Sequence, residues 1–129
     1  MIQVYSDAAC CNQRKIGCYA YIIEYEGKTY KKGGKIPHCK NSNEAELYAM
    51  LKATELLCIL SPDGGLVTYW TDSLHSIKIV YGDKQYKVAD QLLELINIVN
   101  FAWTINYLPR NSTPQLTWCD TKTKEYYDT

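Results

Sequence analysis

The segment Ile2-Gln3-Val4-Tyr5-Ser6-Asp7 broadly alternates apolar and polar side chains and contains several residues of high β propensity. This pattern predicts a half-buried strand. We expect the strand to end at Asp7, because residues 8–15 form a short, small and polar segment that is typical of a loop. A carboxylate at a strand end lies at an edge of the sheet, which is where open α/β sheets bind their ligands.

The rest of the chain predicts further strands and helices in a mixed order. Strands are expected at 16–25, at 29–32 (ended by the pair Gly33-Gly34), at 66–70 and at 101–108. Helical periodicity occurs from residue 44 to the turn at 61–65, over 73–80 and 88–99, and in a short segment at 116–127. The order β-β-β-α-β-α-β-α indicates an α/β fold, and we expect residues 1–129 to form a single domain.

The first predicted helix begins beside a group of capping residues. Asn41-Ser42-Asn43 precedes acidic residues of the first turn, which is the usual sequence signature of a helix N-terminus. Apolar and small side chains then recur at helical spacing, so one face should pack on the sheet: Leu47, Met50, Leu51, Thr54 and Leu57. Glu46 lies in the first turns of this helix, and we expect it to face the sheet or its rim.

Composition limits the classes of protein that the chain can belong to. The 129 residues can bury a real core, and no apolar run approaches the ~20 residues of a membrane-spanning helix. The start of the chain has no secretory leader, so we expect a soluble, cytoplasmic protein whose six cysteines are thiols. Fourteen basic and fourteen acidic side chains give zero net charge, which argues against a strong stand-alone nucleic-acid binder.

Three acidic residues occupy informative positions. Asp7 and Asp72 each follow a predicted strand, and Glu46 lies near the start of a helix. Carboxylates at one sheet edge repel each other, and a hard divalent cation with oxygen ligands would explain their clustering. Two such ions, ~3.5–4 Å apart, can activate water and stabilise a leaving oxygen at phosphorus.

Each of these acids also has an ordinary structural interpretation. Asp7 could end a strand at a turn, and Asp72 could take part in capping the next helix through Ser73. Glu46 could be a solvated acid that the helix dipole favours. Only the joint occurrence of the three acids in this order of elements favours a metal site.

The sequence resembles the type 1 ribonuclease H family over nearly its whole length. The resemblance lies in five segments: Val4-Tyr5-Ser6-Asp7-Ala8-Ala9, the glycine-led strand from Gly17 to Ile23, Asn41-Ser42-Asn43-Glu44-Ala45-Glu46-Leu47, Thr71-Asp72-Ser73, and Tyr107-Leu108-Pro109-Arg110 with the later Asp120. This family resemblance implies a five-stranded mixed sheet, its first three strands antiparallel, with helices on both faces.

The same resemblance implies a function and a set of site residues. The expected activity is endonucleolytic hydrolysis of the RNA strand of RNA–DNA hybrids, leaving 5′-phosphates. The catalytic residues, which would also hold two Mg²⁺ ions replaceable by Mn²⁺, are Asp7, Glu46, Asp72 and Asp120. The hybrid would contact Ser42, Asn43, Ser73 and Arg110. We expect a monomer that does not bind membranes and that could work with a polymerase or another replication protein.

The chain also departs from the family pattern. Arg110 stands where many members have a mobile histidine, neither His38 nor His75 is near it in sequence, and a basic helix between Asp72 and residue 101 looks absent. The neutral charge leaves open an alternative, a catalytically weak or inactive nucleic-acid-binding module of the same fold. Related proofreading exonucleases usually carry Asp-x-Glu on the first strand, whereas Ala8-Ala9 follows Asp7 here.

Overall fold

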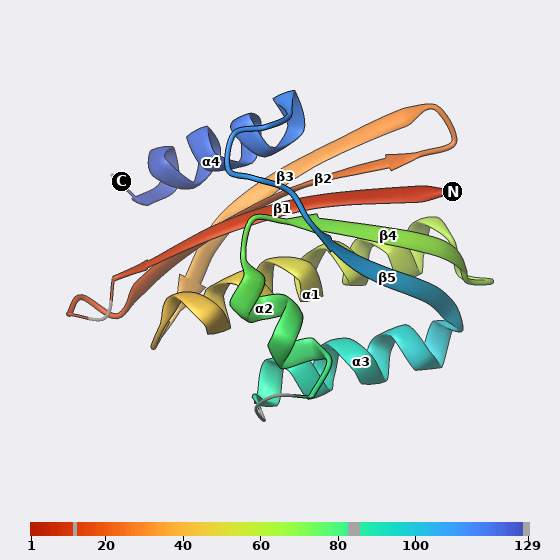
Figure 1. The fold of residues 1–129 in the computed structure, drawn as a ribbon, viewed down its shortest axis with the longest axis horizontal. Helices are drawn as coiled ribbons and strands as arrows, with labels where there is room; N and C mark the ends of the chain where they lie inside the picture. The colour runs from red at the N-terminus through yellow and green to blue at the C-terminus, as the bar shows by residue number, and fades with distance from the viewer. Residues whose placement is uncertain (12, 83–85, 128–129) are drawn as a thin grey trace.

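The computed structural model describes residues 1–11, 13–82 and 86–127. These residues form five strands and four helices (Figure 1): β1 (Ile2–Cys11), β2 (Ile16–Tyr25), β3 (Lys28–Pro37), α1 (Ser42–Leu60), β4 (Gly65–Thr71), α2 (Leu74–Val80), α3 (Lys87–Val99), β5 (Phe101–Tyr107) and α4 (Pro114–Tyr127). The stretch expected to hold one helix between β4 and β5 contains two, which correspond to its two periodic segments.

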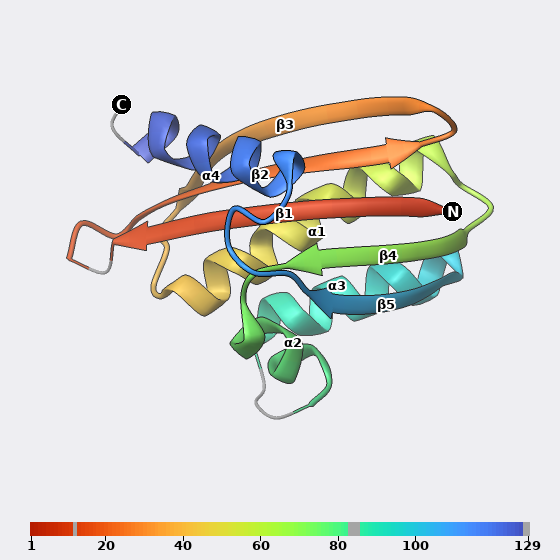
Figure 2. The same ribbon diagram turned by 45° about the horizontal axis from the view of Figure 1, so that its top comes forward.

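The strands form one mixed sheet in the order β3-β2-β1-β4-β5. β1 pairs antiparallel with β2 and β2 with β3, whereas β4 is parallel to both β1 and β5. Helix α4 covers one face, and α1 with α2 and α3 covers the other (Figures 1 and 2). The predicted fold class, a five-stranded mixed sheet with helices on both faces, is confirmed.

Helix α1 is held to the sheet by its apolar stripe. Leu47, Met50 and Leu57 are fully buried in the main core cluster, and Thr54 is buried with its hydroxyl within 2.6 Å of the Tyr69 hydroxyl. The helical spacing of these residues therefore predicted the correct face. No helix in the described residues has both the length and the apolar character needed to span a membrane.

The prediction that β1 ends at Asp7 is wrong. β1 continues to Cys11, because residues Gln3 to Cys11 all pair with β2, while the parallel pairing with β4 stops at Tyr5. The small polar residues after Asp7 belong to one arm of a hairpin rather than to a loop. Asp7 therefore lies inside β1, two residues beyond the point where β4 leaves it.

The prediction that Gly33-Gly34 ends the third strand is also wrong, because β3 runs on to Pro37. A tyrosine ring packs closely against each of the two glycines. A Cβ at Gly33 would lie 2.8 Å from the Tyr126 ring of α4, and one at Gly34 would lie 3.0 Å from the Tyr19 hydroxyl oxygen. The absence of side chains lets aromatic rings cover the strand here.

Candidate metal centre

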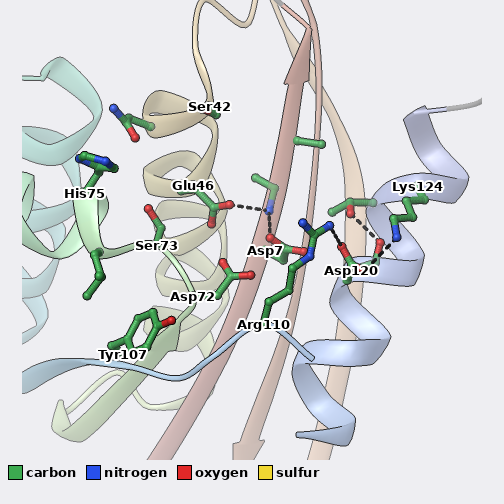
Figure 3. A pocket seen from close by; sticks show the side chains of 15 residues that line it. Asp7, Ser42, Glu46, Asp72, Ser73, His75, Tyr107, Arg110, Asp120 and Lys124 are labelled. Carbon is green, nitrogen blue, oxygen red and sulfur yellow. Dashed lines mark hydrogen bonds and ion pairs between the residues drawn. The ribbon is translucent and has the colours of Figure 1, made fainter. Parts of the chain in front are cut away.

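Three carboxylates converge where β1 and β4 separate. One oxygen from each of Asp7, Glu46 and Asp72 lies within 4.8 Å of the others (Figure 3). Asp7 comes from β1, Glu46 from the second turn of α1, and Asp72 directly follows the last residue of β4. Three segments that are distant in the sequence thus bring oxygen donors to one point.

A backbone amide joins two of these acids. The N–H of Ala8 donates to Asp7 Oδ1 at 2.9 Å and to Glu46 Oε1 at 3.3 Å. The start of α1 that positions Glu46 is capped by Asn41, whose side-chain oxygen accepts from the Glu44 N–H at 2.8 Å. Strand β1 and helix α1 are therefore connected directly at the cluster.

The ordinary interpretations of the three acids do not match their surroundings. Asp7 is inside a strand and buried, and Glu46 is buried with 8% of its surface exposed rather than solvated. Helix α2 is capped by Ser73, whose hydroxyl accepts from the Ser76 N–H at 3.2 Å, so Asp72 is not its cap. The site needs another explanation for its three acids.

Burial and mutual repulsion raise the pKa values of the three clustered carboxyl groups. Burial, and then repulsion by Asp72, raise the pKa of Asp7 to about 7. Burial together with repulsion by Asp7 and Asp72 raises the pKa of Glu46 well above its ordinary value, and burial raises that of Asp72. A cluster of this kind favours binding either protons or another positive charge.

The donor set fits a hard divalent cation. All the converging atoms are carboxylate oxygens, which are the ligands that Mg²⁺ and similar ions prefer. In addition, Glu46 Oε2 is buried and has no hydrogen-bond partner among the described residues. Since buried polar atoms are normally partnered, this oxygen is available as a ligand. The acidic group could hold a metal ion.

Asp120 lies near the cluster but has other partners. It is on α4, where Arg110 contacts its Oδ1 at 2.8 Å and Lys124 contacts its Oδ2 at 3.1 Å (Figure 3). Burial acts to raise the pKa of Asp120, but the hydrogen bonds from Arg110 and Lys124 outweigh it and the pKa is lowered. Asp120 does not belong to the group of three whose oxygens converge.

A cavity of about 540 Å³ opens over these residues. It is lined by all four acids and by the four side chains expected to contact substrate: Ser42, Asn43, Ser73 and Arg110. Arg110 reaches it because the chain after β5 is tied to the end of β4, where the Leu108 N–H donates to the Thr71 carbonyl oxygen at 2.9 Å.

Seven residues that line the cavity were not among the predicted site residues, and two of them, Lys124 and His75, carry basic side chains. Lys124 could have been found from its spacing, four residues after Asp120 on a predicted helix, which puts both on one face. His75 lines the cavity from the first turn of α2 (Figure 3). Its position three residues after Asp72 was a weak signal, because the direction of a side chain in a short helix depends on how that helix packs.

The family model described as RNase H matches residues 1–123. This chain therefore belongs to the RNase H family, as its motifs predicted. No curated protein matches the sequence.

The fold is shared with solved structures of low sequence identity. RNase H1 from the halophilic archaeon Halobacterium salinarum NRC-1 is 18% identical with a TM-score of 0.78, covering 98% of this chain and 97% of that one. The N-terminal RNase H domain of Rv2228c from Mycobacterium tuberculosis, solved as a maltose-binding-protein fusion, is 13% identical with a TM-score of 0.81, covering 98% and 93%. LC11-RNase H1, in complex with an RNA/DNA hybrid, is 20% identical with a TM-score of 0.76, covering 99% and 97%.

Proposed function

We propose that this chain is an endonuclease that hydrolyses the RNA strand of RNA–DNA hybrids with the help of a divalent cation. The observation that carries the proposal is the convergence of Asp7, Glu46 and Asp72, together with the unpartnered buried oxygen of Glu46. Membership of the RNase H family supports it. So does the fold shared with LC11-RNase H1, a protein solved with an RNA/DNA hybrid.

Asp7, Glu46 and Asp72 would hold the cation, and Mg²⁺ is the ion we expect, with Mn²⁺ as a substitute. When bound, such an ion supplies activated water and neutralises charge that develops on phosphate oxygens. The protein contributes a rigid frame for the ligands. β1 and α1 share the Ala8 N–H between two carboxylates, so neither Asp7 nor Glu46 can move without loss of a hydrogen bond.

Asp120 and its two basic partners form the other side of the cavity. We expect Asp120 to act as the fourth catalytic acid and to contribute to a second ion. Arg110 and Lys124 are 61% and 66% exposed at their side chains, so they can contact a phosphate as well as Asp120. Charge-assisted hydrogen bonds from a guanidinium or an ammonium group to phosphate would orient the scissile strand.

The opposite side of the cavity would recognise the hybrid. Ser42 and Asn43 lie at the start of α1 and Ser73 at the start of α2, so their polar groups line the cavity beside the carboxylates. Small hydroxyl and amide groups can hydrogen-bond to 2′-hydroxyls, which are the groups that distinguish RNA from DNA. Cleavage would add water across the bond from phosphorus to the 3′-oxygen, leaving 3′-hydroxyl and 5′-phosphate ends.

The test is incubation of the protein with labelled RNA–DNA hybrid, duplex RNA and duplex DNA, each with Mg²⁺ and with EDTA. We expect cutting of the RNA strand of the hybrid alone, and only with Mg²⁺. Asp7→Asn should remove this activity, whereas Asp63→Asn, which changes an exposed acid in the turn after α1, should keep it. Hybrid binding without any cleavage would instead identify a non-catalytic binding module, and equal cutting of duplex DNA would refute the proposed substrate.

A further inference from the structure

Two cysteines from distant segments meet on the face of the sheet that α1 covers. Cys10 on β1 is paired with Gly17 on β2, which is paired with Ile36 on β3, so the three form a row across the sheet. Gly17 leaves a gap in the middle of this row, and Cys39 fills it. A Cβ at Gly17 would lie 2.7 Å from the Cβ and 2.8 Å from the Sγ of Cys39.

The two cysteines belong to one small apolar cluster. Cys39 is completely buried with Ile36 and Ala45, and the half-buried Cys10 packs against the same cluster. Burial, and then the neighbouring Cys10 thiol, raise the pKa of Cys39 to about 12. The Cys39 thiol also donates to the Asn41 carbonyl oxygen at 3.6 Å.

The position of Cys39 in this row favours a disulfide with Cys10. Paired residues across an antiparallel ladder have Cβ atoms ~4.5–5.5 Å apart, and a disulfide needs ~3.5–4.5 Å. Cys39 lies over Gly17, so its side chain occupies the cross-strand position next to Cys10. Cys11 is the neighbour of Cys10, but successive side chains of a strand point to opposite faces, so Cys11 is turned away from Cys39.

We propose that Cys10 and Cys39 form a reversible disulfide by exchange with a low-molecular-weight disulfide such as glutathione disulfide. The Cys10 thiolate attacks one sulfur of the reagent and releases one glutathione. The Cys39 sulfur then attacks the Cys10 sulfur of the mixed disulfide, and the Cys39 proton passes to the glutathione thiolate that leaves. The protein thiols lose two protons and two electrons in total, and glutathione disulfide is reduced to two thiols.

The bond would tie together the two elements that carry the acidic cluster. Cys10 lies two residues after Ala8, whose N–H bridges Asp7 and Glu46. Cys39 lies two residues before Asn41, which caps α1. The disulfide would join β1 to the segment just before α1. It would also close a loop in the unfolded chain and lower the conformational entropy of that state, so we expect the oxidised protein to be more stable than the reduced one.

The first test is peptide mapping of the wild-type protein after incubation with glutathione disulfide and alkylation of the remaining thiols. Trypsin cuts after Arg14, Lys35 and Lys40, so the expected product is residues 1–14 linked to residues 36–40. This product should form in Cys11→Ser, the matched control, and should be absent from Cys10→Ser. A link through Cys11, or a reaction that stops at a glutathione adduct on Cys10, would overturn the proposal.

The second test is the melting temperature of the same samples. Oxidation should raise it by ~5 °C in the wild type and in Cys11→Ser, and dithiothreitol should reverse the change. Cys10→Ser should show no rise. If that variant does not fold, the wild-type map and its reversal still decide the matter. A melting temperature that stays the same or falls on oxidation would show that the bond does not fit the native geometry.

Discussion

Replacing Asp7 by Asn tests whether Asp7 is a metal ligand or a residue that stabilises the fold. Burial and repulsion by Asp72 raise the pKa of Asp7 from 3.8 to about 7. Each tenfold change in proton affinity corresponds to ~1.4 kcal/mol, so the charged form of Asp7 destabilises the metal-free fold by ~4 kcal/mol. Since the pKa is raised on folding, stability is fully present below pH 3.8 and is lost as the pH rises towards about 7.

Asn removes this charge but keeps most of the contacts. Its side-chain oxygen can still accept from the Ala8 N–H, and its amide can donate to Glu46. We take the cost of imperfect hydrogen bonding as ~1–2 kcal/mol. In EDTA at pH 8, Asp7→Asn should therefore be more stable than the wild type by ~2 kcal/mol, or roughly 6–10 °C in melting temperature.

The assay is a set of melting curves in EDTA from pH 5 to pH 8, followed by the same curves with Mg²⁺. The advantage of the variant should grow by ~2–3 kcal/mol over this pH range as Asp7 ionises in the wild type. Mg²⁺ should raise the melting temperature of the wild type by mass action and that of the variant much less. Asp63→Asn should match the wild type at every pH. If Asp7→Asn melts clearly below the wild type in EDTA at pH 8, Asp7 stabilises the fold and the metal-site account of it must be withdrawn.

Three further substitutions test other parts of the structure. Asn41→Ala should cost ~1 kcal/mol in denaturant unfolding because the side-chain cap of α1 is lost, and an unchanged midpoint would show that the cap contributes nothing. Gly33→Ala should cost ~1–3 kcal/mol, since the new Cβ would lie 2.9 Å from the Tyr19 carbonyl oxygen and 2.8 Å from the Tyr126 ring; a neutral effect would mean that α4 can move away. Arg110→Ala should weaken hybrid binding and make the salt dependence of log affinity shallower by about 1, and an unchanged slope would exclude a phosphate contact.

Local sequence patterns were sufficient to predict which segments form strands and helices and which face of α1 is buried, but not where β1 and β3 end. The apolar spacing from Leu47 to Leu57 predicts which side is buried, because helical periodicity is a property of neighbouring residues. The end of β1 was not predictable in this way. Residues after Asp7 are small and polar, and only their pairing with β2, a non-local property, makes them a strand.

The same distinction applies to the site. The capping residues before Glu46 predicted where α1 begins, but whether Glu46 faces Asp7 or solvent depends on how α1 packs on β1. The ion pairs of Asp120 with Arg110 and Lys124 depend on the placement of α4 relative to the chain after β5. Local sequence could not predict that Cys39 lies next to Cys10 either, because this depends on the strand register that places Gly17 beside Cys10.

Calorimetric titration of Mg²⁺ into the metal-free protein near pH 7, in several buffers of different ionisation enthalpy, shows whether the three carboxylates bind a cation. Burial raises the pKa of Asp7 to about 7 and that of Glu46 well above its ordinary value, so a cation that binds these carboxylates must displace protons. We predict binding with release of about one proton per ion in the wild type and in Asp63→Asn, and greatly weakened binding in Glu46→Gln. Binding without proton release, or binding that Glu46→Gln leaves unchanged, would contradict the assignment of these carboxylates as the metal centre.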